Sequence, residues 1–430
     1  MTFFCSTLGC KVNQYESQLL QQRLEQAGYA AAEDAAADVV IVNSCTVTSE
    51  SERKTRQLIR RFRKLNRDSI IVLTGCVPQA NPSAAEDLTD ADIILGHADA
   101  ARLPALLEDF LRTGARQIAV SSHQRGESMD VTATAAFSGR TRANVKIEDG
   151  CNRRCTYCII PKARGWVRSK PISDLTREVS ALAAAGFVEV VLVGINLTAY
   201  GQDLGCELCD AVEVISRISE VKRIRLGSLE PDRLSDEQLE RLAACPPLCP
   251  QFHLSLQSGC NRTLQAMGRQ YTAEDFYALS RKIRSLFPDA SITTDMMVAF
   301  PGESNEDFAA SVAFAHEIAF EKIHVFPFSP RQGTPAAAMP GQLPRSIKAE
   351  RCRQLMAAAQ EIRTRWLTAQ TGRTLLVLPE EAHLQGGMQG YSANYTPVRV
   401  LDATAADRNR LVDVRIIGVE EDSCIGTLLR

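Results

Sequence analysis

The most constraining feature of this chain of 430 residues is a group of three cysteines spaced C-x3-C-x2-C. They are Cys151, Cys155 and Cys158, and they follow a short predicted strand that ends at Ile147. Three thiolates cannot complete a tetrahedral zinc site without a fourth protein ligand, and the nearby sequence offers none. They suit a [4Fe–4S] cluster in which three irons carry a thiolate and the fourth iron stays open. Buried, inert cysteines are the alternative, but Gly150 and the basic flanking residues indicate a loop.

An open iron can hold a small molecule through an amine and a carboxylate. S-adenosylmethionine (SAM) is held in this way before it is cleaved reductively to a carbon radical. The cysteine spacing, with the aromatic residue Tyr157 before the last cysteine, closely resembles the radical-SAM superfamily. This resemblance implies a SAM site beside the three cysteines and includes Tyr157 in it.

The composition limits the number of domains and the cellular setting. A chain of this length with 45% hydrophobic residues is too long for one core, so we expect two or three domains. Fourteen cysteines without a signal peptide indicate reduced thiols and bound metal in the cytoplasm. No apolar stretch approaches the length of a membrane span, so we expect no membrane partner. Because the net charge is −2, any nucleic acid must bind to local basic patches.

The first 115 residues alternate apolar runs with amphipathic segments. The predicted strands are Phe3–Leu8, Val39–Asn43, Ile70–Thr74 and Ile93–Leu95, and the predicted helices are Tyr15–Gln26, Glu50–Lys64 and Ala101–Leu111. Short strands joined by helices predict a doubly wound, parallel α/β sheet.

A second group of cysteines stands just past or near the ends of three of these strands. The group consists of Cys10, Cys45 and Cys76. Because ligands bind outside the carboxyl ends of the strands in such sheets, we expect the three loops to converge on one edge. We interpret these cysteines as the ligands of a second cluster, again with one open iron. Three ordinary small buried residues are the alternative.

The next part of the chain predicts a linker and a barrel. Residues 116–137 show little periodicity and are interpreted as the linker. Within residues 138–367, the predicted strands are Val145–Ile147, Val188–Gly194, Ile224–Ser228, Phe252–Leu256, Ile292–Phe300 and Ile323–Phe328. The predicted helices between them are Asp174–Ala185, Ala211–Ser219, Ser235–Ala244, Thr272–Leu286 and Asn305–Phe320, and a long basic helix, Arg345–Leu367, follows. Six strand–helix units predict an open partial (βα)6 TIM barrel with its chemistry at the carboxyl ends of the strands.

Residues 368–430 have a different pattern. Short strands are predicted at Leu375–Leu378, Ala393–Val400, Leu411–Ile417 and Gly426–Leu429, and glycines and polar turns separate them. This pattern predicts a small β-barrel. The whole chain is therefore expected to be a multidomain α/β protein with a β-barrel at its C-terminal end.

Polar residues at the ends of the barrel strands are candidates for binding SAM. Gly194 allows close approach of the backbone, and Asn196 offers both a donor and an acceptor. A carboxylate suits ribose hydroxyls. The candidates, with Tyr157, are Gly194, Asn196, Ser228, Glu230, Gln257 and Asp295. A plain strand-ending turn remains open for Gly194 and Asn196, and His253 is interpreted as an interior histidine with satisfied hydrogen bonds.

Two runs of basic residues lack any acid. Arg53 to Arg67 contains eight basic residues on a predicted helix, and Arg153 to Lys170 contains six. A solvated surface would normally include Glu at helical spacing, so the first run favours a polyanion such as RNA. The RNA-binding candidates are Arg53, Lys54, Arg56, Arg60, Arg61, Arg164, Arg168 and Arg331. For the second run a solvated loop is the alternative.

Four further cysteines imitate a zinc spacing. They are Cys206, Cys209, Cys245 and Cys249. The first two start an amphipathic helix, and the other two flank a Pro-Pro turn. We therefore interpret all four as small structural residues instead of metal ligands.

The motifs together identify the chain as a member of the methylthiotransferase family. The strings GCKVNQYES, NSCTVT and TGC at Cys10, Cys45 and Cys76 resemble the N-terminal domain of that family, and a radical-SAM barrel and a TRAM barrel follow in the family's order. The segments GCKVNQY, INLTAYG and GYSANY resemble the MtaB-type branch. Branches that act on isopentenyladenosine tend to have GCQMN in the first motif, and those that act on a ribosomal-protein aspartate tend to have GCPKN.

The resemblance implies an enzyme that converts N6-threonylcarbamoyladenosine at position 37 of tRNA into its 2-methylthio derivative. It implies two [4Fe–4S] clusters, SAM as radical source and methyl donor, an electron donor such as flavodoxin or ferredoxin, and the anticodon loop of ANN-decoding tRNAs as partner. The alternatives are the other two branches of the family and, more distantly, a non-catalytic iron–sulfur RNA-binding protein or redox sensor.

Two features depart from the family pattern. Ala299 stands where the family usually has Gly. Residues 368–430 contain six basic and eight acidic residues, so the TRAM barrel is not basic. The runs Arg53–Arg67, Arg153–Lys170 and Arg345–Arg365 are therefore expected to carry more of the phosphate contact.

Overall fold

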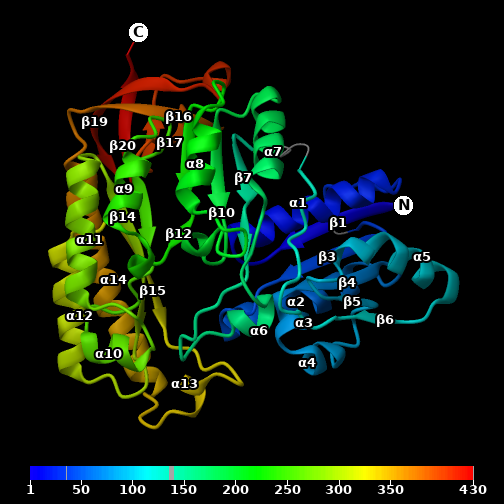
Figure 1. The fold of residues 1–430 in the computed structure, drawn as a ribbon. Coiled ribbons are helices and arrows are strands. Elements are labelled where there is room, and N and C mark those ends of the chain that lie inside the picture. Colours follow the sequence, from blue (N-terminus) through cyan, green and yellow to red (C-terminus); the bar gives the residue numbers. More distant parts are fainter. Residues whose placement is uncertain (35, 135–139, 430) are drawn as a thin grey trace.

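The structure is a computed structural model that describes residues 1–34, 36–134 and 140–429. Residues 135–137 of the predicted linker, residues 138 and 139 of the predicted barrel region and Arg430 lie outside the described residues. Figure 1 shows a parallel sheet from the N-terminal part on one side of a central set of strands. A small barrel from the C-terminal part covers the top of the central strands.

The N-terminal sheet has six parallel strands in the order β2-β1-β3-β4-β5-β6. They are β1 (Thr2–Thr7), β2 (Ala30–Ala31), β3 (Val39–Ser44), β4 (Ile70–Gly75), β5 (Ile93–Leu95) and β6 (Gln117–Ala119). The four strands predicted from the sequence are all present. β2 and β6 were missed because, unlike Ile93–Leu95, neither contains a run of large apolar residues, and β6 lies in the predicted linker.

Helices cover both faces of this sheet, as predicted for a doubly wound fold. The helices are α1 (Lys11–Gln26), α2 (Ser49–Leu65), α3 (Cys76–Ala80), α4 (Pro82–Glu86) and α5 (Leu103–Thr113). Leu20 and Leu24 of α1 pack with α5 on one face, whereas Ile59 and Phe62 of α2 pack on the other. β3 and β4 are fully buried, which explains their uninterrupted apolar sequence.

The central strands form an open arc of parallel strands with helices on its outer side (Figure 1). The strands are β7 (Arg142–Lys146), β10 (Glu189–Val193), β11 (Arg223–Leu226), β12 (Ser228–Leu229), β13 (Gln251–Leu254), β14 (Ser291–Val298) and β15 (Lys322–Pro327). The helices are α7 (Ile172–Ala184), α8 (Leu208–Ser216), α9 (Asp236–Ala243), α11 (Ala273–Leu286), α12 (Asn305–Ile318) and α14 (Arg345–Thr368). The third predicted strand is divided at Gly227 into β11 and β12, so the arc consists of one sheet of three strands and one of four.

Local sequence signals place the starts of the outer helices. Ser235, Thr272 and Ser304 accept hydrogen bonds from the third residues of α9, α11 and α12, and form capping boxes there. The apolar faces of these helices and of the strands meet in the largest core of the molecule. Ala299, just after β14, has a φ of +57°, a region that favours glycine and explains the family's preference for glycine there.

The C-terminal strands close into a five-stranded barrel, as predicted. They are β16 (Thr374–Ala382), β17 (Met388–Ser392), β18 (Pro397–Val400), β19 (Val412–Glu420) and β20 (Ser423–Leu428). β17 was missed because Gly390 indicated a break. Gly390 lies inside the strand, where a Cβ atom would come within 2.3 Å of the Leu378 carbonyl oxygen.

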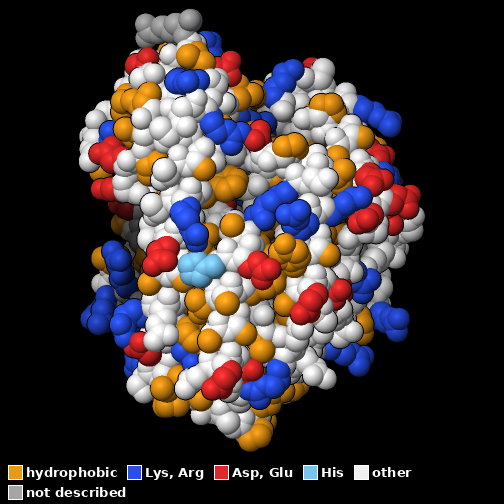
Figure 2. All heavy atoms as spheres, turned by 90° about the vertical axis from the view of Figure 1, so that its left-hand side faces the viewer, with side chains coloured by type: hydrophobic (Ala, Val, Ile, Leu, Met, Phe, Trp, Pro, Cys, Tyr) orange, Lys and Arg blue, Asp and Glu red, His pale blue; other side chains and the backbone are white. Residues whose placement is uncertain are grey.

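The remaining elements are short. β8 (Glu148–Asp149), α6 (Ile160–Arg164) and β9 (Arg168–Ser169) follow β7, and β8 pairs with β9. The others are α10 (Asn261–Ala266), α13 (Pro335–Ala338) and 3-10 turns at Ala100–Arg102, Leu197–Ala199, Pro231–Arg233 and Ala405–Asp407. No helix among the described residues is long and apolar enough to cross a membrane. Figure 2 shows the face on the left of Figure 1, where acidic and basic side chains are interspersed.

Candidate active site

The loop between β8 and α6 carries Cys151, Cys155 and Cys158. Gly150 has a φ of +87°, and a Cβ atom there would come within 2.0 Å of the Trp166 carbonyl oxygen, so only glycine lets the loop start this way. N–H groups surround the sulfur atoms. Asn196 Nδ2 lies 3.7 Å from Cys151 Sγ, and Arg269 Nη1 lies 3.3 Å from Cys155 Sγ. Such donors stabilise thiolates, the form that binds iron.

The second group of cysteines converges at the carboxyl edge of the N-terminal sheet. Cys10 caps α1, Cys45 follows β3 and Cys76 begins α3. A Cβ atom on Gly9 would lie 2.9 Å from Cys45 Cβ, which shows how closely the first two loops meet. Arg164 Nη2 lies 3.5 Å from Cys76 Sγ. The structure therefore brings together three cysteines that are separated by more than thirty residues each.

The chemistry of both groups fits a cluster better than a single ion. Two thiolates on one zinc can be no more than about 4.6 Å apart, because the Zn–S bond is about 2.3 Å long. Within the described part of the chain, neither cysteine group brings its three sulfur atoms within 4.8 Å of one another. A [4Fe–4S] cube places each thiolate on a different iron and accepts this wider spacing.

Burial opposes ionisation of these thiols in the absence of metal. It raises the pKa of Cys76, of Cys151 and of Cys158 to about 12 in each case. It also raises the pKa of Cys45. Neighbouring thiols of the same group add to these shifts. Cluster binding must therefore displace protons from the sulfur atoms.

A buried ionic network joins the two cysteine groups. Arg164, with no exposed surface, binds Glu16 of α1 at 2.6 Å and Asp149 of β8 at 3.2 Å. Lys146 binds the same two carboxylates at 2.7 and 2.6 Å. Burial raises the pKa of Glu16, but the charges of Arg164 and Lys146 outweigh it and hold the pKa well below its usual range. Cys76 and Ala80 of α3 also pack against α6, which follows Cys158.

This network corrects part of the RNA-binding prediction. Arg164, Arg168 and Arg331 are 0%, 6% and 7% exposed. Arg168 pairs with Glu127 and Asp149, and Arg331 pairs with Glu52. Their guanidinium groups are already neutralised inside the protein, so the prediction that they contact RNA is wrong.

The same correction applies to some members of the other two basic runs, whereas Arg154, Lys162, Arg345, Arg353 and Arg365 are exposed. In Arg153–Lys170, the buried Lys170 pairs with Glu178, and Arg153 pairs with Asp232. In Arg345–Arg365, the buried residues Arg351 and Arg363 pair with acidic residues inside the protein. The first run differs, because its five candidates are exposed on α2; they are Arg53, Lys54, Arg56, Arg60 and Arg61. Of these, Arg53 pairs with Glu50 on the same helix.

The predicted SAM residues fall into two sets. Gly194, Ser228 and Asp295 line one cavity with a volume of about 600 Å³, together with Cys10. The others surround the Cys151–Cys158 loop or support it. Asn196 contacts Cys151, Glu230 pairs with Arg269, and the ring of Tyr157 packs edge-on against Phe300. Gln257, with a φ of +69°, joins β13 to β14 through its backbone.

Three functional candidates carried no signal in the sequence. Arg269 contacts Cys155, and Glu16 joins the two cysteine groups. Glu148 Oε2 accepts a hydrogen bond of 2.7 Å from the Asn196 N–H, whereas its buried Oε1 has no partner among the described residues. Burial raises the pKa of this carboxyl to about 8. Their partners are distant in sequence, although the acid before the Asp149-Gly150-Cys151 turn could have pointed to Glu148.

The surroundings of Glu148 show whether the amino-acid end of SAM can bind beside Cys151. Gly194 leaves room beside its carboxylate, since a Cβ atom there would come within 2.6 Å of Glu148 Oε2. An unsatisfied buried carboxylate oxygen suits the ammonium group of an amino acid. The residues next to Cys151 therefore fit the amino-acid end of SAM.

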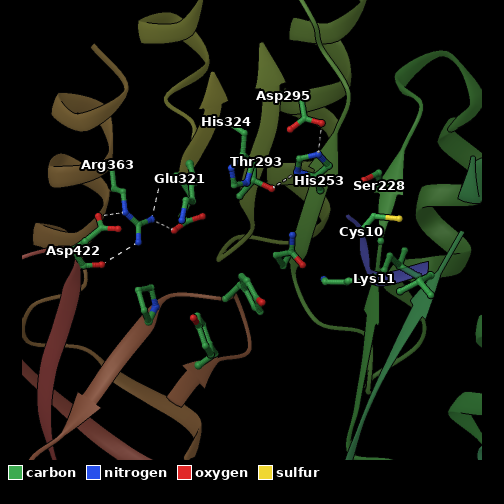
Figure 3. Close-up of a pocket in the computed structure, with 18 of the residues that line it drawn as sticks. Cys10, Lys11, Ser228, His253, Thr293, Asp295, Glu321, His324, Arg363 and Asp422 are labelled. Carbon is green, nitrogen blue, oxygen red and sulfur yellow. Dashed lines mark hydrogen bonds and ion pairs between the residues drawn. The ribbon is translucent and has the colours of Figure 1, made fainter. Parts of the chain in front are cut away.

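The cavity extends from Cys10 into the interior of the strand arc (Figure 3). Figure 3 shows Cys10 and Lys11 at one end and Arg363 with Glu321 and Asp422 at the other. Between them, His253, Asp295 and His324 offer ligand atoms within 4.8 Å of one another, a set that suits a divalent cation or a polar ligand. His253 also bonds Thr293 at 2.9 Å, which agrees with its interpretation as a satisfied interior histidine.

The four cysteines with zinc-like spacing are separate from both groups. The thiols of Cys209 and Cys245 donate to backbone carbonyl oxygens at 3.4 and 3.5 Å. The interpretation of all four cysteines as structural residues stays a prediction.

Comparisons with known proteins agree with this geometry. Residues 2–96 match the uncharacterized protein family UPF0004, and residues 145–315 match the radical SAM superfamily. The radical S-adenosylmethionine methyltransferase TsrM from Kitasatospora setae shares the fold, with a TM-score of 0.59 at 16% identity over 78% of this chain and 77% of that chain. The fold and the three-cysteine loop define a radical-SAM enzyme.

Sequence relatives narrow the class. The chain is 39% identical to threonylcarbamoyladenosine tRNA methylthiotransferase MtaB of Thermotoga maritima, over 90% of this chain and 89% of the relative. It is 35% identical to the enzyme of that name from Bacillus subtilis, over 96% and 92%. A tRNA-2-methylthio-N(6)-dimethylallyladenosine synthase of Pelotomaculum thermopropionicum is 35% identical over 90% and 88%. The chain belongs to the MtaB-type methylthiotransferases, radical-SAM enzymes that transfer a methylthio group and use SAM and [4Fe–4S] clusters.

Proposed function

We propose that the protein is a tRNA methylthiotransferase that converts N6-threonylcarbamoyladenosine at position 37 into its 2-methylthio derivative. The observation that carries the proposal is the position of the two cysteine groups. Cys76 packs against the helix that follows Cys158, and Cys10 lines the same cavity as Gly194 and Ser228. The cavity thus borders the auxiliary group at Cys10, and Gly194 connects it to the other group through Glu148 and Asn196, which contacts Cys151. The names of the relatives supply the substrate.

Each cysteine group has an assigned role. Cys151, Cys155 and Cys158 hold the cluster that binds SAM, and Cys10, Cys45 and Cys76 hold the auxiliary cluster. When bound, these groups supply a carbon radical for removal of the adenine C2 hydrogen, and the sulfur and methyl group that replace it. Arg269 and Arg164 orient one sulfur atom in each group and offset its charge.

The chain's other residues bind and position the two substrates. Glu148, Asn196 and Gly194 receive the amino-acid end of SAM, and Ser228, Glu230, Asp295, Gln257 and Tyr157 complete that side of the site. The cavity of about 600 Å³ is large enough for a single base. A base in the anticodon loop can leave its stack and enter it, as single-stranded RNA allows.

The exposed basic side chains of α2 bind the phosphates of the anticodon loop. α2 follows Cys45, so the start of this helix is the part that lies nearest the auxiliary group. Ion pairing with phosphates releases counterions, so this binding weakens as salt rises. The tRNAs are those that decode ANN codons.

The proposed organisation has four parts. Residues 1–115 form the methylthiotransferase domain, 116–137 the linker, 138–367 the radical-SAM domain and 368–430 a TRAM domain. The protein works in the cytoplasm and receives electrons from a flavodoxin or ferredoxin.

Nucleoside analysis of tRNA from a deletion strain tests the proposal. We expect loss of 2-methylthio-N6-threonylcarbamoyladenosine and accumulation of its unmethylthiolated precursor, while 2-methylthio-isopentenyladenosine is unchanged. Complementation with the intact gene restores the product, and so does Cys352→Ser, which alters a half-buried cysteine outside both groups. Cys76→Ser does not restore it. Persistence of the product in the deletion strain, or loss of the isopentenyl form instead, contradicts the proposal.

A further inference from the structure

Lys11 is a cation at one end of the large cavity, and no acidic side chain among the described residues pairs with it. It follows Cys10 at the first position of α1, and its side chain lines both the large cavity and a neighbouring cavity of about 280 Å³. It is half-buried, and among the described residues it has no hydrogen bond and no ion pair. A positive charge in the first turn also opposes the helix dipole. Lys11 therefore occupies a position that lowers stability unless an anion binds there.

The neighbouring cations differ from Lys11 because each already has a carboxylate. The ring of Tyr395 lies beside three of them, with Lys11 Nζ 5.8 Å, Arg142 Cζ 5.2 Å and Arg225 Cζ 4.6 Å from the ring centre. Arg142 binds Glu380 at 2.6 Å, and Arg225 binds Glu189 at 2.9 Å. The two arginines pair with Glu380 and Glu189, whereas Glu381, which lines the smaller cavity, forms no ion pair with Lys11 among the described residues. Lys11 is left as the charge that a ligand can pair with.

We propose that Lys11 binds the carboxylate of the threonylcarbamoyl group and selects this substrate over bases with an apolar N6 substituent. This inference rests on the proposed function, because it names the part of the substrate that the site recognises. Adenine C2 must lie close to the cluster on Cys10, and the carboxylate at the end of the N6 substituent is the base's only negative charge. Lys11, next to Cys10 and facing the same cavity, is placed to meet it.

The selectivity follows from the cost of an unpaired charge. A carboxylate gives Lys11 a charge-assisted hydrogen bond in a cavity partly closed to water. A dimethylallyl group would cover Lys11 and remove its water without offering an acceptor. A site built to bind a polar group rejects an analogue that lacks it, because its own polar atom is then left unsatisfied. Lys11 thus strengthens binding of the acidic substituent and weakens binding of the apolar one.

A neutral analogue tests the contact directly. The substrates are two anticodon stem-loops, one with N6-threonylcarbamoyladenosine and one in which its carboxylate is replaced by the carboxamide. Reconstituted wild-type enzyme should bind the acid about tenfold more tightly than the amide without reductant, and should modify it with a kcat/KM about tenfold higher. Lys11→Met should lower both values for the acid to those of the amide and leave the amide nearly unchanged. Lys11→Arg should retain the preference.

Lys322→Met is the matched control. Lys322 lines the same cavity and is the next residue after Glu321, which Figure 3 shows at the end opposite Cys10. It should retain the preference of the wild type for the acid. Iron content should be the same in all variants, and the thermal midpoint of Lys11→Met should not fall below that of wild type, because among the described residues Lys11 forms no hydrogen bond or ion pair. If wild type modifies the acid and Lys11→Met still prefers it, the inference is wrong and the proposed function stands. If wild type modifies neither stem-loop, the proposed function itself fails.

Discussion

The two cysteine groups each provide three thiolates for a cluster, but they bring these thiolates together in different ways. Cys151, Cys155 and Cys158 come from one loop, whereas Cys10, Cys45 and Cys76 come from the ends of three adjacent strands. Each group has a buried arginine beside one sulfur atom. Arg269 binds partners within the strand arc, namely Glu230 and the Ser255 carbonyl oxygen. The partners of Arg164 belong to both halves of the site. The dispersed group therefore depends on the junction between the halves, and the local group does not.

The largest expected effect is loss of one cluster at a time. Replacement of Cys45 or Cys155 by Ala should lower the iron content from about eight to about four per chain and abolish methylthio transfer, since each cube needs its three thiolates. Iron analysis of anaerobically reconstituted protein measures this. The Cys155 variant should also lose SAM cleavage, whereas the Cys45 variant should retain it. Loss of all iron from either variant would show that the groups do not bind clusters independently.

The next largest effect is a difference in stability between variants of Arg164 and of Arg269. Arg164→Met should destabilise the protein by about 3–5 kcal/mol, because it leaves the buried Glu16 and Asp149 with too little positive charge. Arg269→Met should cost about 1–3 kcal/mol, because Glu230 is partly exposed and Arg153 lies 3.7 Å from it. Chemical denaturation under anaerobic conditions compares them, with exposed Arg67→Met as a control. Equal losses for the two arginines would contradict the difference between the groups.

The stability of the protein should depend on pH through Glu148, which lies beside the Cys151–Cys158 loop. Burial raises the pKa of Glu148 to about 8 from an ordinary value of 4.5. The folded protein then holds a proton that the unfolded chain releases, so this contribution to stability is complete below pH 4.5 and is lost as the pH rises to about 8. Glu148→Gln removes that dependence. Its stability relative to wild type should increase from pH 5 to pH 8 and then level off, as thermal melts across this range can measure.

The smallest effect concerns the exposed basic residues of α2. Arg60→Glu together with Arg61→Glu should weaken tRNA binding about tenfold at low salt and reduce the dependence of affinity on salt, because phosphate contacts are lost. Fluorescence anisotropy with an anticodon stem-loop measures both. Arg112→Glu, on an exposed position of α5, serves as the control. Unchanged salt dependence in the double variant would place the RNA elsewhere.

Local patterns identified much of the fold and part of the site. Buried strands such as Val39–Ser44 have a continuous apolar sequence, and the cysteines of the site follow such strands or lie in one short loop. The same reasoning failed for Gly390, which lies within a strand, and for Gly227, which divides one. In both cases the position of a neighbouring strand decides whether glycine lies within a strand or divides it. That position cannot be predicted from the spacing of residues along the chain.

Runs of basic residues show most clearly what the sequence pattern cannot predict, namely which charged side chains are exposed. Arg60 on α2 and Arg164 on α6 lie in similar basic sequences, yet the first is exposed and the second has no exposed surface. A run of like charge contains no acid, so an acid that pairs with one of its side chains must come from outside the run. Arg164 and its partner Glu16 are 148 residues apart.

The sequence by itself determined most of the helices and longer strands and where the six cysteines stand on them, because helix and strand periods and ligand spacings act over a few residues. The tertiary structure alone decided which charges are neutralised. It paired Arg164, Arg168 and Arg331 with distant acids and left Lys11 without one in the part of the chain that the structure describes. The physical reason is that an ion pair depends on distance in space, and the fold sets that distance only after the chain has brought remote segments together.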